Sequence, residues 1–434
     1  MLKIGSHENT LNNTLLEVSV SKKVLRLLPK IVFLAAVMGI AAGSGFLAGQ
    51  HWKPQINSKN PEQLAQLPDH ATPLKPGPWG NLESLPICIE PPEEYLSIQN
   101  YENADRRWRF PGMLPDQVSA VFTEEDLTGE QQAQLLDRSK WRQANGEIIV
   151  APSNELVLSL SQHARKRIYG VLSGTLGNLV RSLRCSFPAD RFDAIFAESG
   201  LSSETIALVK KLSFPHGRLV FFCDAPLALD LLSDYEEKVR LIKTLTRKET
   251  LLLKLHVMPD SDINALQTYW TKASWGKDVK PMLESLGKVP GGARLSLVHL
   301  LPPIPTECLY TYPFPSTKLE DLHKDCHWTA FNFFRDTPDN RFTDPTVVQE
   351  TIRNDYYPVI SDPRYGDIVM LATEKGAIIH SSVYIADNIV YTKNSGEYIN
   401  PFLLMTIPDM IDTFEAFIPE SEHLKVLVYR SKYY

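Results

Sequence analysis

The chain has 434 residues, of which 43% are hydrophobic and 22% are charged, a composition typical of globular proteins. Its length is enough for two or three domains, and its formal net charge of -6 gives no electrostatic basis for binding nucleic acid. The five cysteines include no C-x-x-C pair and no zinc-ligand spacing, which excludes the common cysteine-based metal motifs.

The first predicted element is a single transmembrane helix at residues 31–49, an uncharged stretch long enough to cross a hydrocarbon core. Lysines and an arginine gather between residues 22 and 30, just before this stretch. The positive-inside rule then places residues 1–30 in the cytoplasm and the main domains in the periplasm or outside the cell. A cleaved signal peptide is the alternative interpretation.

Glycines within this stretch also bear on assembly. Gly39 and Gly43, and again Gly45 and Gly49, have the small-xxx-small spacing that lets membrane helices approach closely. This spacing is compatible with a homodimer formed through the helix, although glycine is common in membrane spans in general.

Residues 50–80 are rich in proline and lack apolar periodicity, so they are predicted to form an extended linker. Residues 81–310 alternate helical and strand patterns, which predicts a middle domain of α/β or α+β type and unknown function. Within it, a helix capped at Ser153 is expected to run as far as Leu172.

Three arginines of this middle domain alternate with aromatic residues, at Arg106, Arg107 and Arg109. Such interleaving would suit a polymer ligand, and a structural loop is the alternative interpretation. No nucleotide-binding, zinc-protease or serine-hydrolase motif occurs in the sequence.

The chemistry is expected in residues 311–434, where Cys326 begins an aromatic-rich helix. A helix N-terminus lowers the pKa of a thiol, and a neighbouring imidazolium lowers it further, so a cysteine in this position is a candidate nucleophile. The alternative is that Cys326 is a small buried apolar residue.

A histidine lies on one of the strands predicted to follow, at residues 367–372, 377–385 and 389–393. Alternation along the second strand puts His380, Ser382 and Tyr384 on one face. His380 is therefore expected to meet the Cys326 helix, where it would act as base toward the thiol and then as acid toward the leaving group. Asn394, beyond the third strand, is a candidate to orient the imidazole.

The order Asp325-Cys326, then Gly366-Asp367-Ile368-Val369, then His380-Ser381-Ser382-Val383-Tyr384-Ile385 resembles the NlpC/P60 superfamily of papain-like cysteine hydrolases. The resemblance covers about a quarter of the chain. It departs from the family pattern after the cysteine, where His327-Trp328 replaces the usual Ser-Gly.

This resemblance implies a papain-like α+β fold for the C-terminal domain and cleavage of amide bonds, most typically in cell-wall peptides, through a thioester on Cys326. The third polar position of the family falls near Thr392, which joins Asn394 as a candidate. The backbone of Asp325 is implied near the oxyanion. Neither a cofactor nor a metal is implied, although the spacing of His323, Cys326 and His327 also permits a metal cluster.

The sequence therefore predicts a membrane-anchored cysteine peptidase or amidase outside the cytoplasm, with peptidoglycan or another amide as its substrate. A second interpretation remains open, in which the papain-like module is degenerate and the protein is a membrane-tethered binding or scaffold component.

Overall fold

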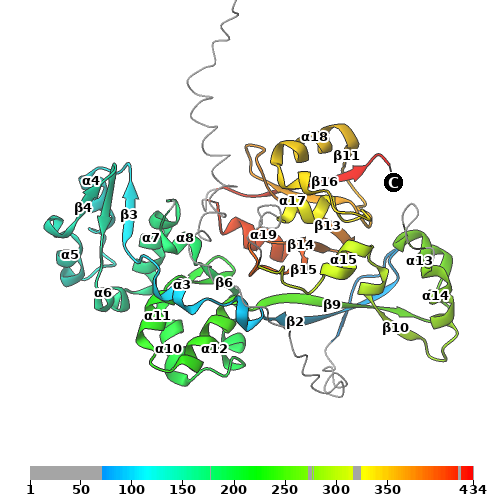
Figure 1. Cartoon of the computed structure of the whole chain (residues 1–434), viewed down its shortest axis with the longest axis horizontal. Helices are drawn as coiled ribbons and strands as arrows, with labels where there is room; N and C mark the ends of the chain where they lie inside the picture. Colours follow the sequence, from blue (N-terminus) through cyan, green and yellow to red (C-terminus); the bar gives the residue numbers. More distant parts are fainter. Residues whose placement is uncertain are drawn as a thin grey trace, which may run out of the picture. The chain divides into compact units, whose positions relative to one another are not determined.

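The computed structural model describes residues 71–433, except 176, 272–275, 277, 316–323 and 419–421 (Figure 1). The predicted cytoplasmic segment 1–30, the predicted membrane helix 31–49 and most of the predicted linker lie outside these residues. Within the described ranges, no helix is both long enough and apolar enough to span a bilayer. The described residues belong to one compact unit of mixed α+β structure.

The first part of the described chain contains two small antiparallel sheets surrounded by helices. The strands are β3 (Trp108–Pro111), β5 (Glu147–Val150) and β4 (Arg142–Ala144) in one sheet, and β6 (Cys185–Pro188), β8 (Leu219–Phe222) and β7 (Phe214–His216) in the other, each in that order. The short helices are η2 (Glu93–Tyr95), α3 (Ile98–Glu102), α4 (Pro115–Val121), α5 (Gly129–Leu135), η3 (Arg138–Lys140), α8 (Leu179–Ser182), α9 (Phe192–Ala197) and α11 (Ala225–Leu231). The longer ones are α7 (Gln162–Ser173), α10 (Ser203–Leu212) and α12 (Tyr235–Thr246). One hydrophobic core joins these elements.

The single helix expected from Ser153 to Leu172 is wrong, because the chain breaks it in two. Helix α6 (Asn154–Ser159) ends at Leu160, whose backbone is extended, and α7 begins after Ser161. The Ser161 side chain accepts a hydrogen bond from the N–H of Ala164 and so caps the new helix.

A long antiparallel ribbon leads to the C-terminal half. Strands β1 (Thr72–Pro73), β2 (Asn81–Ile89), β9 (Lys248–Val257) and β10 (Ala293–Ser296) form a four-stranded sheet in that order. Helices α13 (Ile263–Trp270), α14 (Val279–Gly287), η4 (Leu297–Leu300) and α15 (Pro303–Cys308) follow β9 and β10 along the chain.

The C-terminal half is built on a six-stranded antiparallel sheet in the order β11-β16-β12-β13-β14-β15. Its strands are β11 (Tyr356–Val359), β12 (Ile368–Ala372), β13 (Ile378–Ala386), β14 (Ile389–Lys393), β15 (Phe402–Thr406) and β16 (Lys425–Ser431). Its helices are α17 (Cys326–Phe331), η5 (Asn340–Thr343), α18 (Pro345–Asp355) and α19 (Ile407–Glu415). The three strands expected near the histidine therefore form, within one residue of their predicted ends.

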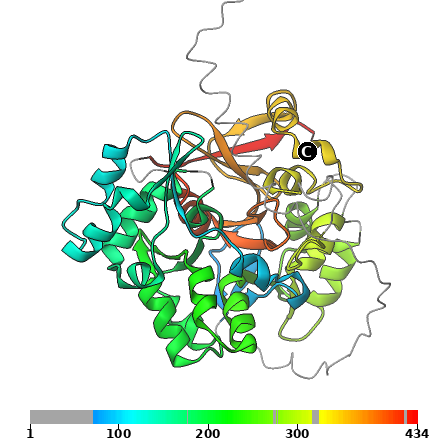
Figure 2. The same ribbon diagram turned by 60° about the vertical axis from the view of Figure 1, so that its left-hand side comes forward.

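Two helices bury the two faces of this sheet. In both views the yellow helix α17 lies beside the orange strands β13 and β14 (Figure 1 and Figure 2). Val383 of β13 packs in a core with Trp328 of α17, whereas Tyr384 packs in a separate core with Met410 and Phe414 of α19. Because both faces are covered, β12 and β14 are buried along their whole lengths.

The hydrophobic cores do not separate at residue 310, where a domain boundary was expected. Leu253 and Leu255 of β9 belong to the same core as Val383 and Ile385 of β13. Two hydrogen bonds reinforce this packing. The Tyr269 hydroxyl donates to the carbonyl of Ile385 over 2.7 Å, and the Thr250 hydroxyl donates to the carbonyl of Leu404 over 2.9 Å. The second half of the expected middle domain thus packs as part of the C-terminal half.

Candidate active site

Helix α17 begins at Cys326 because Asp325 caps it. The Asp325 carboxylate accepts a hydrogen bond from the N–H of Trp328 over 3.0 Å, which satisfies one of the free donors of the first turn. Trp328 and Phe331 are buried in the core below the helix. The cap and the aromatic anchors together hold the cysteine at a defined position on the sheet.

The thiol of Cys326 is buried, with 8% of the residue exposed. Burial raises the pKa of Cys326, and the neighbouring carboxylate of Asp325 raises it further. The backbone N–H groups of Ser381 and His327 interact with the sulfur and oppose this rise. The expected lowering of the thiol pKa is therefore outweighed in this conformation, and the resting side chain is a neutral thiol.

His380 projects from the face of the sheet that α19 covers. Its ring stacks on Phe414 with centroids 4.0 Å apart. The next residue, Ser381, projects toward α17, where its hydroxyl oxygen lies 2.8 Å from Nδ1 of His327. This alternation follows from the pleat of β13, in which successive side chains point to opposite faces.

Thr392 on the neighbouring strand β14 holds the imidazole of His380. The Thr392 hydroxyl lies 2.7 Å from Nε2 of His380 and donates a longer hydrogen bond, over 3.5 Å, to the carbonyl of Ser381. The Thr392 hydroxyl can donate to Nε2 of His380 or accept from it, depending on the imidazole tautomer. In the tautomer where it accepts from Nε2–H, Nδ1 is the unprotonated nitrogen.

Nδ1 of His380 is buried and has no hydrogen-bond partner among the described residues. Burial also lowers the pKa of His380 well below its usual value, and the nearby His327 lowers it further. The imidazole is therefore neutral, and its Nδ1 is enclosed in the protein.

The structure does not bring Cys326 and His380 together as expected. No hydrogen bond between Cys326 and His380 occurs in the described part of the chain, because the ring of His380 turns toward Phe414. Ser381 connects the two sites: its N–H interacts with the sulfur of Cys326, and its carbonyl accepts from Thr392. The expectation that the face carrying His380 meets the Cys326 helix is corrected, since that face packs on α19.

The remaining predicted residues take separate places. Of the two candidates to orient the imidazole, Thr392 contacts His380, whereas the side-chain oxygen of Asn394 is buried without a partner among the described residues. The side chain of Asp325 accepts a hydrogen bond as a cap. A carboxylate cannot donate to an oxyanion, so only backbone N–H groups of this segment could do so.

Lys393 is a residue of this site that sequence reasoning missed. It is fully buried at the end of β14, and its ammonium group donates to the carbonyls of Ser395 and, over 2.9 Å, of Glu397. Burial lowers the pKa of Lys393 to about 7, while Asp325, Glu397 and Cys326 act in the opposite direction. The only signal in the sequence was a lysine ending a strongly apolar strand, which is usually a solvated strand end.

The metal cluster that the spacing of His323, Cys326 and His327 permits is not assembled by the described residues, where no group of three metal-ligating side chains occurs. His323, one of its three members, lies outside the described residues. His327 instead contacts Ser381.

Comparison with protein-family models finds no match for this chain, and comparisons with curated proteins and with solved structures find none either.

Proposed function

We propose that this chain is a cysteine hydrolase of the NlpC/P60 type, with a papain-like C-terminal domain that cleaves an amide bond in cell-wall peptides. Cys326 is the nucleophile, His380 the general base and Thr392 the residue that orients the imidazole. Residues 31–49 anchor the enzyme in the membrane with the N-terminus in the cytoplasm.

One observation supports the proposal above the others. Thr392 holds the imidazole of His380 through Nε2, and in the tautomer where the hydroxyl accepts, the buried Nδ1 is left able to accept a proton. This free Nδ1 belongs to the residue adjacent to Ser381, whose N–H interacts with the sulfur of Cys326. A buried base with no partner is costly in a purely structural role, because an unsatisfied polar atom loses its hydration without compensation.

The proposed reaction begins from the neutral thiol and neutral imidazole. The proton of the Cys326 thiol moves to Nδ1 of His380 as the sulfur attacks the carbonyl carbon of the substrate. His380 then gives that proton to the leaving amine, the C–N bond breaks and a thioester remains on Cys326. Water hydrolyses the thioester, again with Nδ1 as base, which releases the acid and restores the thiol.

This reaction requires the His380 ring and the thiol to approach each other from their resting positions. Catalytic hydrogen bonds are often long or unformed before substrate binds. Because His380 and Cys326 lie on opposite faces of β13, the backbone at residues 380–381 would have to turn the His380 ring away from Phe414 and toward α17. Lys393, with a pKa of about 7 and an electrostatic interaction with the sulfur, would stabilise the thiolate once it forms.

The test is the rate at which iodoacetamide alkylates Cys326 in the full-length protein, followed by peptide mass spectrometry between pH 5 and 10. Parent protein, His380→Asn and Thr392→Val are compared, and Cys326→Ala identifies the labelled peptide. We expect alkylation near neutral pH that slows about 100-fold in His380→Asn, the lower end of what a general base contributes. Turnover of a dye-labelled peptidoglycan that Cys326→Ala abolishes would establish the substrate class.

A second function is favoured by the burial of Cys326 and the direction of its pKa. An inert, buried thiol is what a degenerate papain-like module in a binding or scaffold protein would retain. Alkylation that is slow at neutral pH and unchanged in His380→Asn would rule out the hydrolase and leave this function.

The anchor has its own test. Full-length protein should remain in the membrane fraction after alkaline carbonate extraction, whereas a chain lacking residues 1–50 should be released. A signal peptide would instead be revealed by a mature N-terminus beyond residue 41. Cross-linking of the full-length chain but not of the shortened one would support dimerisation through this segment.

A further inference from the structure

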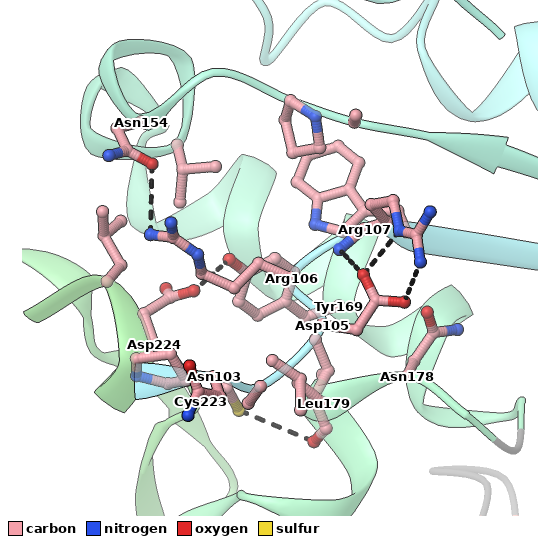
Figure 3. Close-up of a pocket in the computed structure, with 18 residues that line it drawn as sticks. Asn103, Asp105, Arg106, Arg107, Asn154, Tyr169, Asn178, Leu179, Cys223 and Asp224 are labelled. Carbon is pink, nitrogen blue, oxygen red and sulfur yellow. Dashed lines mark hydrogen bonds and ion pairs between the residues drawn. The ribbon is translucent and has the colours of Figure 1, made fainter. Parts of the chain in front are cut away.

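A cavity of 480 Å³ lies in the first part of the described chain, and neither Cys326 nor His380 lines it. Its wall includes residues 103–108 before and in β3, the start of α6 and the start of α11 (Figure 3). We call it the arginine cavity, after Arg106 and Arg107 in its lining. Its volume lies within the range of small-molecule sites in proteins.

One side of the arginine cavity presents a fixed carboxylate. Asp224 accepts hydrogen bonds from the guanidinium of Arg165 and, over 2.6 Å, from the hydroxyl of Tyr169. Arg165 is completely buried, whereas the side chain of Asp224 keeps 13% of its surface exposed. Each carboxylate oxygen accepts more than one hydrogen bond, so Asp224 can still receive a donor from the cavity.

The arginine cavity also presents two guanidinium groups with unused donors. Arg107 binds Asp105 through Nε and Nη2, at 2.6 and 2.7 Å. Arg106 donates through Nη1 to Asn154 and through Nη2 to Asp230. A guanidinium has five N–H donors, so both arginines keep N–H groups for a ligand. In the close-up, Arg107 lies across the cavity from Asp224, whereas the guanidinium of Arg106 lies on the same side as Asp224 (Figure 3).

The segment that carries both arginines is rigidly held. Asn178 accepts from the N–H of Arg109 and donates to its carbonyl, both over 2.8 Å, and donates again to the carbonyl of Leu172. Arg109 in turn binds Asp105 over 2.7 Å. Such bracing fixes the arginines before any ligand arrives, which reduces the entropy lost on binding.

The charges around the cavity balance, and this excludes several ligand classes. Three arginines, at 106, 107 and 165, face three aspartates, at 105, 224 and 230. A polyanion would find no excess of positive charge. A sugar would find no ring to stack on, because the aromatic residues Trp108 and Tyr169 are only 4% and 2% exposed. Trp108, between Arg107 and Arg109, therefore packs in the core beneath β3 and does not form a surface for the polymer ligand considered from the sequence.

We infer that the arginine cavity binds an amino acid or short peptide with free termini, whose carboxylate is held by Arg106 and Arg107 and whose ammonium group lies at Asp224. A cavity that offers both a carboxylate and guanidinium groups matches a zwitterion, and a neutral site avoids the cost of burying a net charge. This inference does not depend on the hydrolase proposed above.

The test is calorimetric titration of the full-length protein with the dipeptide Ala-Ala. Two analogues serve as comparisons: N-acetyl-Ala-Ala, which lacks the ammonium group, and Ala-Ala amide, which lacks the carboxylate. All titrations use the Cys326→Ala background, so that hydrolysis cannot be mistaken for binding. We expect each analogue to bind about 10- to 100-fold more weakly than Ala-Ala, the effect of losing one hydrogen-bonded charge.

Variants assign the two ends of the ligand. Arg107→Gln should weaken Ala-Ala by about tenfold while leaving Ala-Ala amide unchanged. The matched control is Arg142→Gln, which changes an exposed arginine on β4 outside the cavity lining. Asp224→Asn should bring Ala-Ala to the affinity of the acetylated analogue. Asp224→Asn leaves Arg165 without its counter-charge, so the fold of this variant is checked by circular dichroism. If Asp224→Asn unfolds, Arg107→Gln alone tests the inference.

Equal binding of the three dipeptides would overturn the inference, and so would an absence of heat at millimolar Ala-Ala. Weakening of both Ala-Ala and its amide by Arg107→Gln would also overturn it, because the arginine would then not be reading the carboxylate.

Discussion

At the residue scale, the hydroxyl of Thr392 has a role that its burial alone does not explain. It lies 2.7 Å from Nε2 of His380, and when it accepts from that nitrogen it leaves Nδ1 as the unprotonated one. Ser382, on the same face of the neighbouring strand, buries an equivalent hydroxyl that donates only to the carbonyl of Val369. Comparing substitutions of Thr392 and Ser382 therefore distinguishes the stability lost with a buried hydroxyl from the effect of no longer holding the His380 imidazole.

We predict that Thr392→Val lowers the free energy of unfolding by about 1 kcal/mol, since one net hydrogen bond is lost. It should also slow alkylation of Cys326 several-fold, because His380 is no longer held in the reactive tautomer. Ser382→Ala should have a similar effect on stability and none on alkylation. Urea unfolding and the labelling rate check both. An equal effect of the two variants on labelling would show that Thr392 has no special relation to the base.

The buried histidines of this site also predict how stability depends on pH. Burial lowers the pKa of both His380 and His327, whereas an unfolded chain titrates histidine near pH 6.5. Below that pH the unfolded state binds more protons than the folded state. The contribution of the two neutral histidines to the free energy of unfolding is therefore fully present above about pH 6.5. It is lost as the pH falls toward the folded pKa values.

Urea unfolding of the parent protein at pH 7.5, 6.5 and 5.5 should show this decline, with a slope of up to about 1.4 kcal/mol per pH unit for each histidine. The slope should be smaller in His380→Asn. His299→Asn, which removes an exposed histidine, controls for the substitution itself. If His380→Asn leaves the acid slope unchanged, His380 is not the buried neutral group described above.

At the scale of elements, the start of α17 depends on Asp325 in two ways. Its side chain caps the helix, and its charge raises the pKa of Cys326. Asparagine caps helices about as well as aspartate but carries no charge. The two roles can therefore be separated by substitution.

Asp325→Asn should leave the free energy of unfolding within about 0.5 kcal/mol of the parent and accelerate alkylation of Cys326, whereas Asp325→Ala should cost about 1 kcal/mol. Denaturant unfolding and labelling rates provide the measurements. Asp344→Ala is a control that removes the cap of α18 at a different site. Slower labelling of Asp325→Asn would mean that the carboxylate assists the thiol.

The turn that leads into β12 requires glycine at position 366. Its φ is +89°, and a Cβ there would lie 2.1 Å from an atom of the Phe334 ring. Gly376 has a similar φ of +82°, but a Cβ there meets nothing within 4 Å. Substitution of Gly376 therefore measures backbone strain alone, whereas substitution of Gly366 measures strain together with steric overlap.

Gly376→Ala should destabilise the protein by about 1–2 kcal/mol, the cost of left-handed backbone for a side-chain-bearing residue. Gly366→Ala should cost about 1–3 kcal/mol more, because the Phe334 ring must move within a packed core. Thermal or urea unfolding of both variants checks this order. Equal losses would show that the ring yields without cost.

At the scale of the whole molecule, the shared core of β9 and β13 predicts cooperative unfolding across residue 310. Their side chains pack in one cluster, and Tyr269 and Thr250 supply hydrogen bonds to Ile385 and Leu404. Segments buried against each other in one core generally open together.

Hydrogen exchange measured by mass spectrometry should therefore give the same opening free energy for peptides covering residues 251–257 and 383–391. Thr250→Val should lower both by a similar amount, about 1 kcal/mol. Loss of protection in the first peptide while the second stays protected would restore a domain boundary near residue 310.

The sequence by itself determined the local features of this protein. Short runs of apolar and β-branched residues predicted the strands around His380. Aspartate before an aromatic-rich run predicted a helix beginning at Cys326. Each of these signals depends on residues close together in the chain.

Only the tertiary structure decided which partner each face received. The two-residue period of a strand separates His380 from Ser381, but it does not say which face α17 or α19 will cover. Packing turned His380 toward Phe414, enclosed Lys393, and joined β9 to the C-terminal core. These outcomes depend on contacts between residues distant in sequence, whose burial energies no local pattern records.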